Sequence, residues 1–279
     1  MKKPAFITEN PWQQLRSFTD ARIGLGRAGV SLPTEQLLAF QLSHAQARDA
    51  VHFPLDLDAL EQAFIDEGFD APIRLHSQAE DRMTYLQRPD LGRLLNEDSA
   101  ERLRQCFDSP APSFDLALVI VDGLSSTAVA RNTLPFITAL CEQLDSSKDD
   151  WTLAPLTVVE QGRVAIGDEV GELLNASIVL VLVGERPGLS SPDSLGLYMT
   201  WGPRKGLSDA MRNCISNVRP AGLKPEDAAR KAFYLLDESR QRKLSGVELK
   251  DRSQDDVLEH DSTSRSFLIR PLEDKSEKQ

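Results

Sequence analysis

The most informative hydrophobic pattern in the chain is the run at residues 114–121, FDLALVIV, which is almost continuously apolar. Such a run predicts a strand buried on both faces, as in a parallel sheet covered by helices. It stops at Asp122-Gly123, a pair typical of a tight turn, and the serines at 125–126 can cap a helix over 128–144. The stretch therefore predicts one strand-and-helix unit of an α/β fold.

The alternation of strands and helices continues toward the C-terminus. Apolar runs predict strands at 153–160 and 177–183, shorter strands at 197–201 and 213–218, and a long closing helix at 225–244. Because strands and helices alternate, residues 111–246 are predicted to form a Rossmann-like, mainly parallel sheet.

The segments on either side of this sheet differ in composition. Residues 1–110 are predicted to be mainly helical, and residues 247–279 form an acidic tail that is expected to be disordered because it has few apolar residues. Within the first segment, helical spacing is found at 12–25, 31–52, 58–64 and 99–107, the last with a serine cap, and a brief strand is predicted at 73–76.

One glycine motif in the first segment resembles a dinucleotide-binding fingerprint. Residues 24–29, GLGRAG, spell GxGxxG, and Asp49 lies about twenty residues further on, as that fingerprint requires. However, no buried strand precedes Gly24 and Pro33 follows closely, so the pattern favours a helix end followed by a loop.

Composition narrows the classes of partner. A formal net charge of −11 argues against sequence-independent binding to nucleic acid and against binding to an anionic membrane, since both require an excess of Lys and Arg. The N-terminus lacks the apolar core of a signal peptide, so a cytoplasmic protein is expected. The three cysteines are widely spaced and indicate neither a disulfide framework nor a zinc site.

Candidate chemistry lies where the predicted strands end. Polar loops follow three strands, at 122–126, 162–164 and 184–188, and in a parallel sheet they would meet at one edge and line a crevice. The sequence has no GxSxG elbow and no P-loop. These observations favour a binding platform over a catalytic centre.

Six blocks of sequence, in order, resemble the small subunit of ethanolamine ammonia-lyase. They are residues 21–52, RPDLGR at 88–93, VDGLS at 121–125, GRVAIGDEVGE at 162–172, LVGERPGL at 182–189 and NCISNV at 213–218. The resemblance implies an adenosylcobalamin-dependent enzyme that converts ethanolamine to acetaldehyde and ammonia by radical chemistry. It also implies a large TIM-barrel subunit as partner, six heterodimers in the assembly, and a coenzyme that lies between the two kinds of subunit.

The resemblance places the coenzyme contacts on Val164, Glu185 and Cys214, with Arg163 beside them. Val164 is expected to pack on the corrin or its side arms, Glu185 to accept hydrogen bonds from amide groups, and Cys214 to make a small polarisable contact. The alternatives are an ordinary core valine, a glutamate that pairs with Arg186 or caps a loop, and an ordinary buried cysteine.

The resemblance also bears on the cobalt and on location. Enzymes that replace the coenzyme's own base use a histidine in a DxHxxG motif, and no histidine here has that context. Cobalamin is therefore expected to bind base-on, without a bond from protein to metal. Longer family members carry an N-terminal extension associated with a bacterial microcompartment, but here the family-like part begins almost at once, so encapsulation is only a secondary expectation.

Two other functions remain open at this point. One is a stand-alone Rossmann-like enzyme that binds a nucleotide or another cofactor and acts on an unknown substrate. The other is a structural or regulatory subunit without a ligand.

Overall fold

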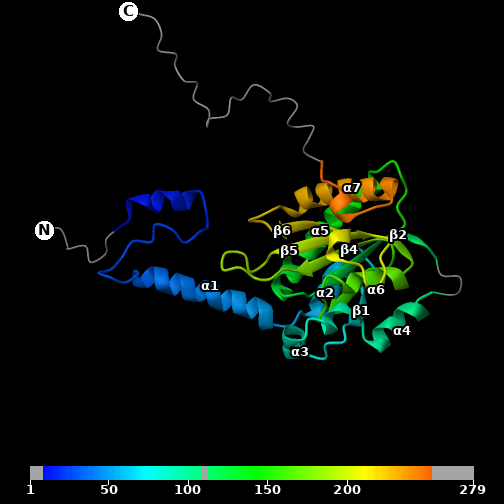
Figure 1. The fold of residues 1–279 in the computed structure, drawn as a ribbon, viewed down its shortest axis with the longest axis horizontal. Helices are drawn as coiled ribbons and strands as arrows, with labels where there is room; N and C mark the ends of the chain where they lie inside the picture. The colour runs from blue at the N-terminus through cyan, green and yellow to red at the C-terminus, as the bar shows by residue number, and fades with distance from the viewer. Residues whose placement is uncertain (1–8, 108–111, 253–279) are drawn as a thin grey trace, which may run out of the picture.

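A six-stranded sheet forms the centre of the structure, a computed structural model that describes residues 9–107 and 112–252 (Figure 1). The strand order is β1-β3-β2-β4-β5-β6. Only β5 runs against its neighbours, because β4 and β6 both pair with it in antiparallel fashion while the remaining pairs are parallel. The predicted α/β fold with a mainly parallel sheet is confirmed. The strands are β1 (Ile73–His76), β2 (Phe114–Val121), β3 (Thr157–Glu160), β4 (Ala176–Gly184), β5 (Leu195–Trp201) and β6 (Arg212–Val218).

Helices cover both faces of this sheet. On one face α5 (Ser126–Asp145) and α7 (Pro225–Arg242) pack against each other and on the strands, with α2 (Leu57–Asp66) beside α5. On the other face α6 (Ile166–Leu173) packs on β2 and β4, and α4 (Glu97–Gln105) packs on β1 and α6. The apolar runs of β2 and β4 are buried because both of their faces are covered, as their continuous hydrophobicity predicts.

The central sheet begins earlier in the chain than predicted. The brief strand expected at 73–76 is present as β1, and it pairs in parallel with β3 from Ile73 opposite Thr157 to His76 opposite Glu160. The sheet therefore takes its edge strand from the segment before residue 110. Between β1 and α4 lie α3 (Arg82–Gln87) and a 3₁₀ turn, η2 (Leu91–Arg93). The RPDLGR block begins directly after α3 and ends with η2.

Three predicted elements differ in the structure. The helix that starts at 97 is capped by Asn96, whose side chain accepts from the backbone N–H of Ser99, so the predicted serine cap is wrong. The strand expected over 153–160 begins only at Thr157, because Pro155 lacks the N–H that a ladder needs. The helix expected over 12–25 is a short 3₁₀ helix, η1 (Pro11–Ser17), followed by a loop.

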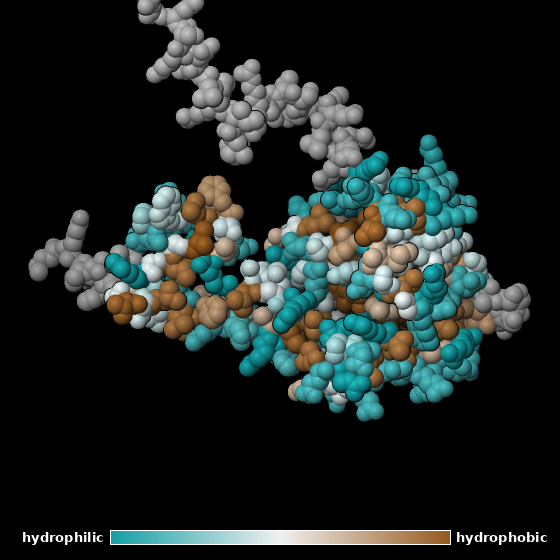
Figure 2. Space-filling view, viewed as in Figure 1, coloured by the Kyte–Doolittle hydropathy of each residue, from teal (hydrophilic) through white to brown (hydrophobic). Residues whose placement is uncertain are grey.

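The N-terminal arm, defined here as residues 9–49, explains that last difference. It consists of η1, a glycine-containing loop and most of α1 (Thr34–His52), and it extends away from the sheet in Figure 1. Among the described residues, its large apolar side chains find little surface to pack on; Phe18 is 86% exposed and Leu42 is 60% exposed. An isolated short amphipathic helix is marginal in water without such packing. Figure 2 shows these apolar residues gathered on the arm.

Two more 3₁₀ turns are present: η3 (Asp209–Met211) directly precedes β6, and η4 (Gly246–Glu248) follows α7. In the described part of the chain no helix combines the length and the apolar composition needed to cross a membrane. Most of the predicted acidic tail, residues 253–279, lies outside the described residues.

Candidate functional site

The carboxyl ends of β2, β3 and β4 meet at one edge of the sheet, as predicted from their polar loops. Two cavities adjoin there. The first, of about 590 Å³, extends from Arg163 and Val164 along β5 and β6 to residues 207–209. The second, of about 410 Å³, lies between the ends of β2 and β4. Both are lined by Arg163, Val164 and Tyr198, so they form one continuous region, the strand-end crevice.

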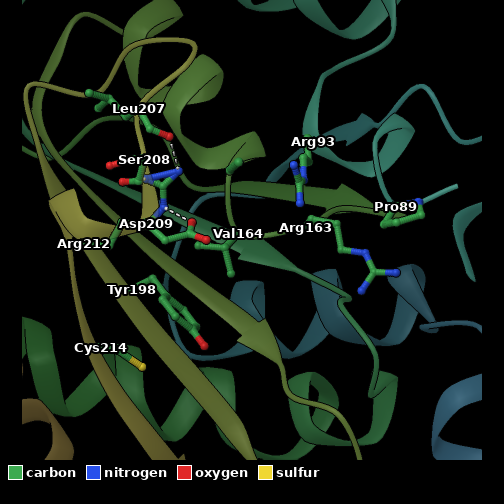
Figure 3. Close-up of a pocket in the computed structure, with 11 residues that line it drawn as sticks. Pro89, Arg93, Arg163, Val164, Tyr198, Leu207, Ser208, Asp209, Arg212 and Cys214 are labelled. Atoms are coloured by element: carbon green, nitrogen blue, oxygen red, sulfur yellow. Dashed lines mark hydrogen bonds and ion pairs between the residues drawn. The ribbon is translucent and has the colours of Figure 1, made fainter.

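All four residues singled out from the sequence line this crevice. Arg163 and Val164 border both cavities, Glu185 borders the second and Cys214 borders the first. Figure 3 shows the side chains of Val164, Tyr198 and Cys214 one after another along the first cavity. Residues from three separate sequence blocks are therefore brought to one place.

The carboxylate of Glu185 is held by hydrogen bonds from Ser194 and Asn217 and not by an ion pair with Arg186. Its Oε2 accepts from the hydroxyl of Ser194 and from the backbone N–H of Asn217, at 3.3 Å in the second case. The absence of a side chain at Gly196 makes room for it, because a Cβ there would lie 3.0 Å from the Glu185 Oε1. The alternative ion pair with Arg186 is absent from the salt bridges among residues 9–107 and 112–252.

Val164 and Cys214 differ in how far they are covered. Val164 is half-buried and packs against the core on the α6 side of the sheet. Cys214 is exposed on β6, opposite Tyr198 of β5, so the alternative of an ordinary buried cysteine is wrong. Partial burial of the thiol among its neighbours nevertheless raises the pKa of Cys214 above its usual range, and the neutral thiol is therefore the form present near pH 7.

The side chain of Arg163 is held in place by Tyr85. Its guanidinium lies 4.2 Å from the centre of the Tyr85 ring, and its Nη2 donates to the Tyr85 carbonyl at 3.2 Å. Its Nε is buried and has no acceptor within the described part of the chain. The backbone N–H of Arg163 donates to Gly92 at 2.7 Å, which joins the RPDLGR block to the end of β3.

Two glycines let the ends of β2 and β4 approach each other closely. Gly123 adopts a φ of +59°, and a Cβ on it would lie 2.3 Å from the carbonyl oxygen of Gly184. A Cβ on Gly184 would lie 2.1 Å from the Ser125 carbonyl oxygen. The backbone N–H of Leu124 uses this proximity to donate to Gly184 at 2.8 Å.

A buried ion pair supports the far end of the first cavity. The Nη2 of Arg212 lies 2.8 Å from the Oδ2 of Asp168, and both side chains are 3% exposed. Burial raises the pKa of Asp168 to about 6, although the Arg212 charge opposes this rise. Arg212 also donates to the carbonyl oxygens of Leu207 and Ser208, so the pair holds the loop that closes the cavity.

Sequence reasoning missed several residues of the crevice. Tyr198 was detectable, because Leu195, Leu197 and Met199 pack toward α7 and strand alternation turns Tyr198 to the opposite face. Tyr85 and Arg212 gave no comparable signal, since their partners Gly162 and Asp168 lie 77 and 44 residues away in the sequence.

Comparison with known proteins identifies the family. The model of the ethanolamine ammonia-lyase light chain family matches residues 9–250. The chain belongs to this family. Annotated relatives include ethanolamine ammonia-lyase small subunits of Pseudomonas fluorescens strain Pf0-1, 54% identical over 97% of this chain and 99% of the relative, and of Azotobacter vinelandii, 58% identical over 88% and 90%. The small subunit of Pseudomonas aeruginosa strain UCBPP-PA14 is 54% identical over 95% of this chain and 97% of its own length.

The family match shows that this chain is a subunit of a lyase. The light chain family is a family of lyase subunits, and the match spans the arm, the sheet and α7. The GxGxxG motif at 24–29 lies on the N-terminal arm, where Gly24, Gly26 and Gly29 all have positive φ in a loop, and residues 9–23 before it contain no strand. The motif therefore lacks the strand and helix that a dinucleotide site requires.

Proposed function

We propose that this chain is the small subunit of an adenosylcobalamin-dependent ethanolamine ammonia-lyase and holds the coenzyme between its strand-end crevice and a large catalytic subunit. The observation that carries the proposal is the meeting of Val164, Glu185 and Cys214 in one crevice of a chain from this family. In this proposal the sheet serves as a Rossmann-like platform. The reaction is the conversion of ethanolamine to acetaldehyde and ammonia.

The crevice has the chemistry that a corrinoid needs. Cobalamin is a broad disc with apolar faces and a rim of amide groups, so its site requires flat apolar contacts and hydrogen-bond partners. Val164, Leu124 and Tyr198 supply the apolar lining, and the glycines at 123 and 184 keep the floor free of side chains. The Oε1 of Glu185 is available as an acceptor because the intramolecular bonds of this carboxylate use Oε2.

Each side chain then has a role in binding. Val164 packs on the disc, Glu185 accepts from amide N–H groups at its rim, Cys214 makes a close neutral contact, and Arg163 offers a fixed guanidinium at the border of both cavities. The coenzyme, when bound, supplies the radical chemistry. The work of this chain is to orient the coenzyme and to exclude water from one side of it.

The histidines support base-on binding. His44 and His52 lie on α1 and His76 ends β1, and none of these three lines the crevice. His260 lies outside the described residues. We therefore propose that the protein gives cobalt no ligand and that the coenzyme retains its dimethylbenzimidazole.

The N-terminal arm supports the proposed large subunit as partner. Its exposed large apolar residues gather on this one segment, and exposed apolar patches mark protein interfaces. The patch includes Trp12, Leu15, Phe18, Leu37, Leu38, Phe40 and Leu42. We propose an assembly of six heterodimers in the cytoplasm.

Replacing Glu185 with Ala is expected to weaken coenzyme binding by the two-subunit enzyme by about 1–3 kcal/mol, the usual cost of leaving buried polar partners unsatisfied. Glu185→Gln should lose less, because it keeps an acceptor oxygen. Coenzyme titration with ethanolamine-deaminating activity as the readout measures both. Glu142→Ala, on an exposed position of α5, is the control and should match the wild type. Unchanged coenzyme affinity in Glu185→Ala would remove this residue from the site.

A further inference from the structure

Arg82 joins three segments that are distant in sequence. It is the first residue of α3 and its side chain is 16% exposed. Its Nε donates to the carbonyl of Val51 at 2.6 Å, in the last turn of α1. Its Nη1 donates to the carbonyl of Gly123 at 2.8 Å, after β2, and to Oε1 of Gln161 at 3.3 Å, after β3. One guanidinium therefore connects the C-terminal end of α1, next to the N-terminal arm, with the segments that follow β2 and β3 at the strand-end crevice.

Tyr85, one turn further along α3, contacts Arg82 itself and the loop that follows β3. Its ring lies 4.8 Å from the Arg82 guanidinium carbon and 4.2 Å from that of Arg163. Its hydroxyl donates to the Gly162 carbonyl at 3.0 Å. The ring is fully buried, so the two arginines and the loop at 161–163 are held against a rigid surface.

Asp122 completes the group from the end of β2. It is buried, its Oδ1 accepts from the backbone N–H of Gly162 at 3.2 Å, and its Oδ2 lies 3.6 Å from the Nη1 of Arg82. Burial raises the pKa of Asp122 to about 6, and the charge of Arg82 and the backbone N–H groups of 123, 161 and 162 oppose that rise. The ends of β2 and β3 are thus bonded to each other as well as to α3.

Arg82 itself lines neither cavity of the crevice. We propose that Arg82 is a positioning residue, which sets the separation of the loops at 122–124 and 161–163 and ties both to the C-terminal end of α1. This inference rests on the proposed function, since it assigns those loops to the coenzyme. Arg82 acts through the loops and makes no contact with the coenzyme.

The test compares Arg82→Leu, Arg82→Lys and the control Arg88→Leu in the assembled two-subunit enzyme. Because small misplacements of a binding group have large effects, Arg82→Leu is expected to raise the Kd for adenosylcobalamin by about 10- to 100-fold. The kcat at saturating coenzyme should change little. Arg88 lies on the same segment but pairs with Asp90 at the surface, so its replacement should leave both values unchanged.

Arg82→Lys separates positioning from simple charge compensation. A lysine keeps a positive charge near Asp122, but its single ammonium cannot match the planar fork that reaches Val51, Gly123 and Gln161 together. It is therefore expected to recover only a minor part of the affinity. Full recovery by Arg82→Lys, or an unchanged Kd in Arg82→Leu, would overturn the proposal.

Hydrogen exchange provides a readout that does not depend on the coenzyme or on a stable Arg82→Leu variant. In Arg82→Lys without coenzyme, the amides of Leu124 and Gly162 should exchange faster, because the loops that carry them are no longer fastened, whereas the amides of β5 should not change. Unchanged exchange in both loops would contradict the positioning role. If the loops loosen but the wild-type assembly binds no cobalamin, the positioning stands and the proposed function fails.

Discussion

Replacing Arg212 with Leu is expected to lower the free energy of unfolding by about 3–5 kcal/mol, the usual cost of removing one partner of a buried ion pair. The substitution leaves the Asp168 carboxylate buried without its guanidinium, 2.8 Å away in the wild type. It also releases the carbonyls of Leu207 and Ser208, which Arg212 holds. Urea denaturation followed by circular dichroism measures the loss.

The loss should depend on pH in a defined direction. A carboxyl whose folded pKa is raised contributes stability that is complete below its unfolded pKa and is lost as the pH rises through the folded value. The pKa of Asp168, about 6 in the wild type, rises further without Arg212. The difference between variant and wild type should therefore widen as the pH rises through about 6, where the wild type stops losing stability and the variant continues to lose it.

Two comparisons make this prediction specific. The double variant Arg212→Leu/Asp168→Leu should recover most of the stability, because a buried pair replaced by apolar residues leaves no uncompensated charge. Arg242→Leu removes a surface pair with Glu238 and should cost less than about 1 kcal/mol. Equal losses in the Arg212 and Arg242 variants would show that the buried pair contributes no more than a surface one.

Replacing Gly123 with Ala is expected to cost about 2–5 kcal/mol, from about 1–2 kcal/mol for the left-handed backbone and about 1–3 kcal/mol for overpacking. The added Cβ would lie 2.3 Å from the Gly184 carbonyl oxygen, where only backbone can yield. The ends of β2 and β4 would have to separate, so coenzyme binding should fall together with stability. Thermal unfolding and coenzyme titration of the same samples measure both effects.

Gly202→Ala is the matched control for the Gly123 variant. Gly202 has a φ of +56°, close to the +59° of Gly123, but a Cβ there would meet nothing within 4 Å. It should therefore show the backbone cost alone and leave coenzyme binding intact. If the two alanine variants lose equal stability, the close approach of the two strand ends has no energetic consequence.

The sequence predicted the central strands well because burial on both faces leaves a pattern that local reading can detect. The runs that became β2 and β4 are continuous and end at turn residues, and the polar loops that follow them meet as expected. Elements whose form depends on a distant or absent partner were predicted less well. The helix expected at 12–25 has apolar residues at helical spacing, but several of them are exposed in the described part of the chain.

The candidate site was predictable only in part, for a related reason. Val164, Glu185 and Cys214 came from sequence blocks that resemble the family. Val164 and Glu185 follow the ends of β3 and β4, whereas Cys214 lies within β6 and reaches the same crevice beside Tyr198. Arg82 belongs to none of the elements or blocks that the sequence pattern singled out. Its role became visible through contacts with Val51, Gly123 and Gln161, which span 31 to 79 residues of sequence.

The central claim is that the strand-end crevice forms one side of a coenzyme site that a large subunit completes. The most direct measurement is a titration of adenosylcobalamin into the isolated chain, into the isolated large subunit and into the two together, with ethanolamine deamination assayed in each sample. The account predicts tight binding and activity only in the combined sample. Tight stoichiometric binding by this chain alone, or activity without the large subunit, would contradict it.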